Sequence, residues 1–247
     1  MSGRNSGIAP YMKAARRQPS STAASILHRI QRRGRGRVYV PRDFLVIESA
    51  SREAVDAALG RLVRDGTIRR IGRGVYDFPK HSRFGPRAPS PDAVADAIAR
   101  TTGESICHGD AKAANLLGVS MQVPAQAVYL TTGTNRVVRV DLGDGQGFDI
   151  RFMRESPSRM LGANTRAGLV LRALHFLGRD GVNDITRVRG LRAALDEDDL
   201  RDLRRLRPEA AGWKRGVIDS ILNVNPDNAP STITKASGAT TPNADLA

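Results

Sequence analysis

The amino-acid sequence predicts an α+β fold made of two successive parts. In both parts, segments whose apolar residues recur every three to four positions, as in helices, alternate with short β-branched segments typical of strands. The chain has 247 residues, of which 40% are hydrophobic and only 4% aromatic, so we expect a core of Leu, Val, Ile and Ala. Residues 80–90 are rich in Pro and have no periodicity, which predicts a linker between the parts.

The first part, residues 21–79, begins with a predicted helix over residues 21–33, one stripe of which is apolar. The Gly-Arg-Gly-Arg run at residues 34–37 ends this helix, because glycine favours conformations that a helix cannot continue. A short strand is expected at residues 38–40. Pro41 then suits the first turn of a brief second helix.

A longer third helix is expected after Ser51, a good N-cap residue, and ends at Gly66. Its apolar residues recur at helical spacing: Val55, Ala58, Leu59, Leu62 and Val63. Residues 67–78 then predict two strands that meet at a Gly-Arg-Gly turn, residues 72–74. Helix, strand, helix, helix and hairpin follow one another in the order of a winged helix-turn-helix domain, whose hairpin is the wing.

Charge is distributed unevenly along the chain. Residues 1–80 contain 17 Lys and Arg against 6 Asp and Glu, whereas residues 81–247 contain 22 and 19. The first 40 residues carry nine basic side chains and no acidic one. A general preference for Arg, which supplies 34 of the 39 basic residues, would not remove acids from one end. The asymmetry therefore predicts a polyanionic partner for the N-terminal part.

A winged helix-turn-helix domain inserts its third helix into the major groove of double-stranded DNA and contacts the backbone with its wing. We therefore expect Ser51 and Arg52, at the start of the third helix, to approach base edges. From the wing, Arg69, Arg70 and Arg73 would contact phosphate or the minor groove. Three further arginines flank the same face as expected phosphate contacts: Arg35, Arg37 and Arg42. The alternative is a winged helix that docks a protein and leaves these arginines solvated.

The second part, residues 91–224, is predicted to mix helices and strands and to end in a helical section. Helices are expected over residues 92–101, 110–118 and 168–178, strands within 127–140 and 148–154, and two or three further helices up to about Leu222. The polar composition of the ends predicts a flexible basic arm at residues 1–20 and a disordered tail at residues 225–247.

His108, Asp110 and Asn115 have the H-x-D-x-x-x-x-N spacing of the catalytic loop of aminoglycoside-type kinases. Phosphoryl transfer also needs a glycine-rich cover over the phosphates, a Lys–Glu pair and a downstream metal-binding Asp. No acidic residue lies between Asn115 and Asp141, and no strand Lys precedes a helix Glu upstream. We interpret Asp110 as a helix cap and predict that the protein is not an enzyme; a phosphotransferase is the weakest alternative.

Other candidate sites have simpler interpretations. The acidic run at residues 196–199 could bind a divalent metal, but Asp196 is better placed as a helix N-cap. Cys107 is the single cysteine and cannot form an internal disulfide. We predict no metal and no cofactor. No apolar run approaches the ~20 residues of a membrane helix, and the Arg/Ser-rich N-terminus lacks the apolar region of a signal peptide. We therefore expect a cytoplasmic protein with no membrane partner.

Three segments together resemble the AbiEi-type antitoxins of type IV toxin–antitoxin (abortive infection) systems. They are GRVYVPRDF, SREAVDAALGRLVRDGTIRRIGRGVYDFPK and DAKAANLLGVSMQVPAQAVYLTTG. The resemblance covers roughly residues 21–220, with both parts in order. It departs from the family at residues 107–110, CHGD, where the family implies a turn of small residues without His.

The resemblance implies a repressor that binds its own promoter through a winged helix-turn-helix domain, and a second domain needed for antitoxicity in phage defence. It also implies a cognate nucleotidyltransferase-like toxin, which is counteracted without requiring a stable complex. Whether the protein binds DNA as a monomer or a dimer stays open. Two alternatives also stay open: a winged-helix protein-interaction adaptor, and a general transcription regulator without a toxin partner. The second domain offers exposed-arginine candidates on its predicted strands: Arg136, Arg139, Arg151 and Arg154.

Overall fold

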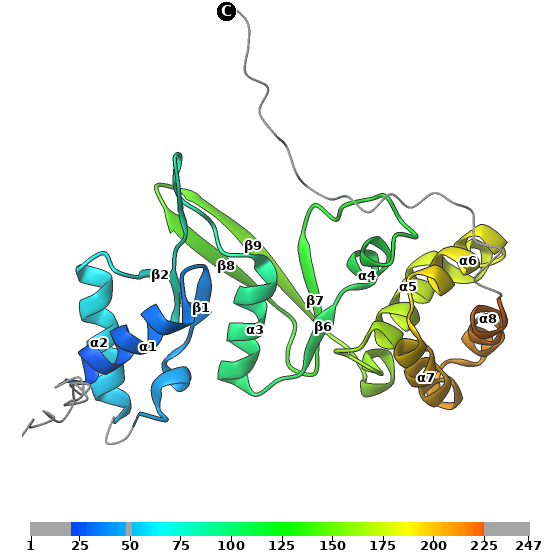
Figure 1. The fold of residues 1–247 in the computed structure, drawn as a ribbon, viewed down its shortest axis with the longest axis horizontal. Helices are drawn as coiled ribbons and strands as arrows, with labels where there is room; N and C mark the ends of the chain where they lie inside the picture. Colours follow the sequence, from blue (N-terminus) through cyan, green and yellow to red (C-terminus); the bar gives the residue numbers. More distant parts are fainter. Residues whose placement is uncertain (1–20, 48–50, 225–247) are drawn as a thin grey trace, which may run out of the picture. The chain divides into compact units, whose positions relative to one another are not determined.

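The computed structural model describes residues 21–47 and 51–224 (Figure 1). These residues form helices together with antiparallel and mixed sheets, so the predicted α+β class is confirmed. The chain divides into two compact units, Met1–Ala97 and Ile98–Ala247. The expected basic arm at residues 1–20 and the expected tail at residues 225–247 lie outside the described residues.

The first unit begins with helix α1 (Thr22–Arg33), which buries Ile26 and Ile30 on one face. The helix ends at Gly34, whose φ of +82° lies in the region that favours glycine. The backbone N–H of Gly34 donates to the last carbonyls of the helix. Strand β1 (Arg37–Tyr39) follows, one residue earlier than expected.

The expected second helix is only a 3-10 turn, η1 (Pro41–Phe44). The Asp43 carboxylate accepts a hydrogen bond from the backbone N–H of Val40 at 3.0 Å, which closes the turn on itself. Phe44 is fully buried and stacks on Tyr39, with their ring centroids 5.7 Å apart. The buried ring therefore fixes the turn without further helical residues.

Helix α2 (Arg52–Arg64) confirms the predicted third helix and its cap. The Ser51 hydroxyl accepts a hydrogen bond from the backbone N–H of Ala54 at 3.2 Å. Four residues of the predicted apolar stripe are buried in the helix: Val55, Ala58, Leu59 and Leu62. They pack with α1 and the sheet in one hydrophobic core.

A three-stranded antiparallel sheet completes this core, with strand order β1-β3-β2. Strands β2 (Arg69–Gly72) and β3 (Val75–Phe78) form the predicted hairpin. β3 is the central strand, and all four of its residues are buried.

Residues 80–90, which the sequence predicts to be a linker without regular structure, contain a second hairpin instead. Strands β4 (His81–Ser82) and β5 (Gly85–Pro86) pair antiparallel. The backbone N–H of Arg87 donates to the Lys80 carbonyl at 2.7 Å and closes the base of the hairpin. Strands of two residues are too short to show periodicity in the sequence. Helix α3 (Pro91–Thr102) begins where predicted and contains the boundary between the two units.

The second unit contains a four-stranded mixed sheet with order β6-β7-β9-β8. Its strands are β6 (Ile106–His108), β7 (Ala127–Thr131), β8 (Arg136–Gly143) and β9 (Gln146–Arg154). Strands β7 and β9 are parallel, and the other pairs are antiparallel. Asp144 and Gly145 join β8 to β9 with positive φ values of 51° and 73°, as a two-residue hairpin turn of the primed type requires.

Five helices pack around the main core of this unit: α4 (Asp110–Leu116), α5 (Arg166–Gly181), α6 (Ile185–Ala193), α7 (Glu197–Leu206) and α8 (Gly212–Asn223). Two 3-10 turns, η2 (Pro157–Met160) and η3 (Arg207–Glu209), connect them to their neighbours. Asp196 caps α7 as predicted, because its carboxylate accepts from the backbone N–H of Asp199 at 2.8 Å. In the described parts of the chain, no helix has the length and apolar character needed to cross a membrane.

Candidate nucleic-acid interface

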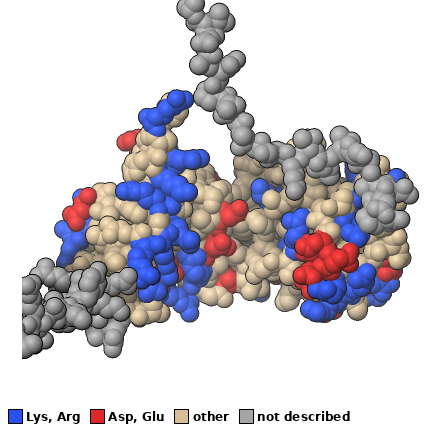
Figure 2. All heavy atoms as spheres, viewed as in Figure 1, with Lys and Arg blue, Asp and Glu red and all other residues tan. Residues whose placement is uncertain are grey.

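The first unit presents most of the predicted DNA-contacting side chains to solvent. Ser51 and every predicted arginine except Arg69 are exposed, and Figure 2 shows Lys and Arg gathered on this unit. Further exposed cations of the same unit were not among the predicted contacts, and four of them are Arg61, Lys80, Arg83 and Arg87. Three of the four lie in the segment that was expected to be a linker, and therefore had no structural context in the sequence.

The exposed face of α2 combines charged side chains with small ones. Arg52 pairs with Asp56 one turn later, with Nε and Oδ2 2.9 Å apart. An exposed pair at this spacing is worth about 0.3–0.5 kcal/mol, so the Arg52 guanidinium can exchange Asp56 for another acceptor at little cost. Ala57 and Gly60 follow on the same side, and no atom lies within 4 Å of where a Gly60 Cβ would stand. This face can therefore approach another surface closely.

The hairpin of β2 and β3, which is the predicted wing, carries Arg70 and Arg73. Arg73 is exposed beside Gly74, whose φ of +68° makes the tight turn possible. Arg70 is exposed on β2, and its Nε donates weakly to the Gly72 carbonyl at 3.4 Å. Both side chains are exposed to solvent.

The structure differs from the prediction at Arg69. Its side chain faces inward and pairs with Asp77. Arg69 Nε donates to Asp77 Oδ1 at 3.1 Å and Arg69 Nη2 to Asp77 Oδ2 at 2.7 Å. The Asp77 side chain is only 2% exposed and that of Arg69 21%. The two residues stand directly opposite each other in the β2–β3 register. A buried carboxylate needs a cation, and Asp77 is the only acidic residue in the predicted hairpin, a signal that could have identified the pair.

Arg35 and Arg37 also make contacts within the unit. The Arg35 guanidinium lies over the Phe78 ring, 4.3 Å from its centroid, and Nη1 donates to the Pro79 carbonyl at 3.1 Å. Arg37 Nε donates to the carbonyl of Arg33, in the last turn of α1, at 2.8 Å. Arg42 is exposed on η1. Arg35 therefore ties the strand β3 to the start of the second hairpin, although the residue itself stays solvent-accessible.

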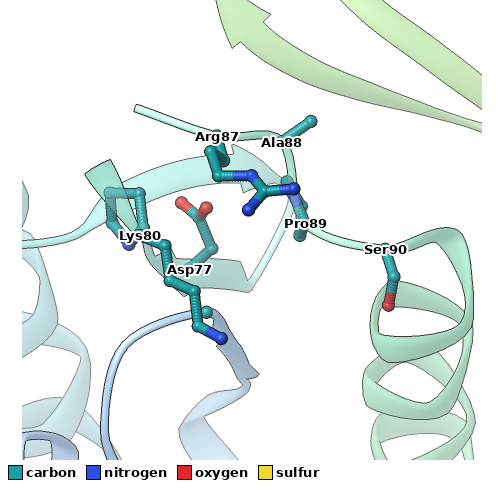
Figure 3. A pocket seen from close by; sticks show the side chains of 8 residues that line it. Asp77, Lys80, Arg87, Ala88, Pro89 and Ser90 are labelled. Atoms are coloured by element: carbon teal, nitrogen blue, oxygen red, sulfur yellow. The ribbon is translucent and has the colours of Figure 1, made fainter. Parts of the chain in front are cut away.

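A pocket of about 220 Å³ lies at the base of the β4–β5 hairpin (Figure 3). Its lining combines cationic, acidic and small residues: Gly36, Asp77, Pro79, Lys80, Arg87, Ala88, Pro89 and Ser90. A side chain at position 36 would place its Cβ 2.8 Å from Lys80 Cε, so glycine leaves room for the Lys80 stem. Because Arg69 already neutralises Asp77, the two cations dominate the charge of this recess.

The kinase-like residues serve local structure in the second unit. Asp110 is the first residue of α4, and Gly109 is the N-cap, which corrects the predicted capping role of Asp110. The Asp110 carboxylate accepts instead from Arg159 Nη2 at 2.7 Å. Asn115 Nδ2 donates to the Ser120 carbonyl at 3.3 Å, within the loop after α4. Over residues 21–47 and 51–224, no group of His, Cys, Asp and Glu is arranged to hold a metal ion.

Two basic side chains are buried in the second unit, which the sequence did not predict. Arg172, on α5, is fully buried, and Nη2 donates to the Ala163 carbonyl at 3.0 Å. Lys214, on α8, donates from Nζ to the Leu171 carbonyl at 2.8 Å. Burial lowers the pKa of Lys214 to about 8, assisted by the nearby positive charge of Arg159. Burial likewise raises the pKa of the Cys107 thiol, which makes it a poor nucleophile.

Residues 25–203 match a family of unknown function, DUF6088. No curated protein matches the chain. Among solved structures, the chain is similar to the crystal structure of the RV2827C protein from Mycobacterium tuberculosis, with 19% sequence identity and a TM-score of 0.38. That alignment covers 87% of this chain and 80% of the other. Since the family match spans well over half of the sequence, the chain belongs to the DUF6088 family.

Proposed function

We propose that the first unit binds double-stranded DNA as a winged helix-turn-helix domain, and that the protein represses its own promoter. The observation that carries this proposal is the exposed basic surface formed by α2 and the β2–β3 hairpin. The order α1, β1, η1, α2, β2, β3 and the sheet order β1-β3-β2 support it, because they present one helix and one hairpin on a shared core.

In this proposal α2 enters the major groove. Arg52 is at the helix start and approaches base edges, where a bidentate contact from Arg to guanine is the most frequent specific contact. The Ser51 hydroxyl oxygen caps the helix, and its proton, which bonds the Glu53 carboxylate in the free protein, would turn to a base or phosphate. Arg70 and Arg73 contact the backbone or minor groove, and Arg61 adds a phosphate contact from the far end of the helix.

The antitoxin function is the further part of the proposal and rests on the resemblance to AbiEi-type antitoxins. The second unit would counteract a nucleotidyltransferase-like toxin, with no stable complex required. Arg151 and Arg154 are exposed on β9 and are the strongest candidates. Arg136 is a weaker candidate, because its guanidinium pairs with Glu104, with Nη2 and Oε2 2.6 Å apart. Arg139 is exposed but lies 3.3 Å from an Asp149 carboxylate oxygen.

The DNA-binding proposal is tested by measuring the affinity of the full chain for the DNA immediately upstream of its gene. A scrambled duplex of the same length and composition is the control, and both are titrated at several salt concentrations. We expect tighter binding to the native sequence at every salt concentration, with a steep fall in affinity as salt rises. Equal binding to both duplexes, lost at moderate salt, would refute a specific repressor.

The antitoxin proposal is tested separately by co-expression with a nucleotidyltransferase-like reading frame adjacent to the gene. The full chain should restore growth, and an Arg151→Ala/Arg154→Ala variant should restore it less well while repressing normally. An Arg70→Ala/Arg73→Ala variant should show the opposite pattern. Absence of rescue by the full chain, at confirmed expression of both proteins, would leave a regulator without a toxin partner.

A further inference from the structure

We propose that the β4–β5 hairpin is a second DNA-contacting element, whose Phe84 ring wedges between base pairs from the minor groove. This inference rests on the proposed DNA binding of the first unit and adds to it a specific site and a specific effect on the DNA. The exposed aromatic ring at the tip of the hairpin and the cations along the hairpin carry the inference together.

Phe84 is exposed in a way that no role in the core explains. The residue is 85% exposed, whereas the other aromatic residues in the described part of this unit are buried: Tyr39, Phe44, Tyr76 and Phe78. An exposed aromatic ring at the tip of a hairpin lacks apolar neighbours that could cover it. A partner that binds to the hairpin would remove this surface from water.

The charge around Phe84 identifies a polyanion as that partner. No acidic residue lies between Asp77 and Asp92, and this stretch contains Lys80, Arg83 and Arg87. The Arg83 guanidinium lies over the Phe84 ring, 4.7 Å from its centroid. In Figure 2, Lys or Arg atoms lie at the tip of the hairpin beside uncharged atoms. An apolar protein groove or a membrane interior would have to desolvate these cations, whereas DNA phosphates pair with them.

The hairpin is held to the sheet by contacts that orient its tip. Arg69 Nη2, fixed by Asp77, also donates to the Arg87 carbonyl at 2.9 Å. Arg35 Nη1 holds the other side of the base through the Pro79 carbonyl. At the tip, the Ser82 hydroxyl donates to the Gly85 carbonyl at 3.1 Å, and the Phe84 backbone N–H lies 3.3 Å from Ser82 Oγ.

A preorganised aromatic ring flanked by cations is suited to enter the minor groove. Apolar side chains that insert between base steps unstack them and kink the duplex, while neighbouring Lys and Arg neutralise the phosphates. Arg35 and Arg69, which the sequence assigned to DNA contact, would then act indirectly. They are positioning residues for the hairpin, and Lys80, Arg83 and Arg87 supply the phosphate contacts.

The test uses the full chain and promoter duplexes carrying 2-aminopurine at successive positions across the bound region. The fluorescence of 2-aminopurine rises when its base is unstacked, and end-labelled duplexes report bending by energy transfer. Wild-type protein should give a fluorescence rise at one base step together with a bend. Phe84→Ala should lose both signals and bind about tenfold to a hundredfold more weakly, as expected for one stacked aromatic ring.

Two control variants sharpen this experiment. Phe84→Trp keeps a stacking ring and should retain both signals. Val46→Ala removes apolar surface from another strongly exposed residue of the same unit and should behave as wild type. Because Phe84 is exposed, all variants should keep the wild-type circular dichroism spectrum and melting temperature.

The possible outcomes separate this inference from the proposed function. Specific promoter binding without any unstacking signal, or with equal signals for wild type and Phe84→Ala, would overturn the wedge and leave the repressor intact. Equal losses for Phe84→Ala and Val46→Ala would also overturn it, because general apolar contact would then explain the effect. Absence of wild-type binding to every duplex would refute the proposed DNA binding itself, and the wedge with it.

Discussion

Replacing Asp77 by Ala should destabilise the first unit by about 3 kcal/mol, because it removes the partner of a largely buried cation. Breaking a buried ion pair by deleting one partner typically costs about 3–5 kcal/mol. The lower end applies here, since the Arg69 side chain is 21% exposed and keeps its hydrogen bond to the Arg87 carbonyl. Arg69→Met should cost about 5 kcal/mol, because the Asp77 carboxylate, 2% exposed, would lose its counter-ion.

The double variant Arg69→Met/Asp77→Leu separates the pair from its surroundings. Replacing both members of a buried pair by apolar residues is often nearly neutral, so the double variant should be more stable than either single variant. Urea unfolding of all four proteins, followed by circular dichroism, gives the coupling free energy. With a urea dependence of about 1–3 kcal/mol per molar, the midpoint for Asp77→Ala should fall by about 1 M or more.

One result would refute this reasoning directly. If Arg69→Met unfolds at the wild-type urea concentration but loses DNA affinity, Arg69 is a DNA contact, as the sequence predicts, and the ion pair has little structural importance. If both single variants are destabilised and their effects simply add, the two side chains act independently, which would contradict the bidentate geometry.

Three other predictions follow from the same structure. Arg73→Ala should weaken binding to all duplexes alike and reduce the log–log salt slope by about one, as measured by salt titration; unchanged affinity would remove Arg73 from the interface. Arg52→Ala should cost about 1–3 kcal/mol on the promoter but little on scrambled DNA, and equal losses on both would make Arg52 a phosphate contact instead. Burial lowers the pKa of Lys214 to about 8 from 10.5. Between these values the unfolded chain binds more protons than the folded chain, so the free energy of unfolding should rise with pH across that window. Lys214→Met should abolish the rise, and a rise that persists in the variant would assign it to another group.

Local signals made part of the fold predictable. The Ser51 cap, the apolar stripe of α2 and the Gly66 stop all lie within one helix, and each is decided by residues three or four positions apart. The same is true of the Asp196 cap. Such features are set by backbone conformation and side chains in one short segment, which a sequence displays directly.

Non-local pairing made the rest unpredictable. The parallel pairing of β7 with β9 brings together residues more than twenty positions apart, and β8 is placed at the sheet edge although it lies between them in the chain. The β4–β5 hairpin is fixed by Arg35 and Arg69, side chains outside it. The inward orientation of Arg69 depends on its register with Asp77, which periodicity alone does not specify.

The number of acidic residues in each unit decides how many of its arginines can form internal ion pairs and how many can contact a ligand. Residues 98–224 contain 19 Lys and Arg against 15 Asp and Glu, so nearly every cation there can find an acid, as Arg136 does in Glu104 and Arg159 in Asp110. Residues 21–97 contain 15 against 8, and the buried Asp77 is already committed to Arg69. At least seven cations of the first unit therefore cannot be neutralised by its acidic residues, whatever rotamers they adopt. A compact unit with this excess repels itself electrostatically, and a bound polyanion relieves that repulsion. Binding of DNA should therefore stabilise the first unit more than the second, as measured by hydrogen exchange of the two units with and without the promoter duplex.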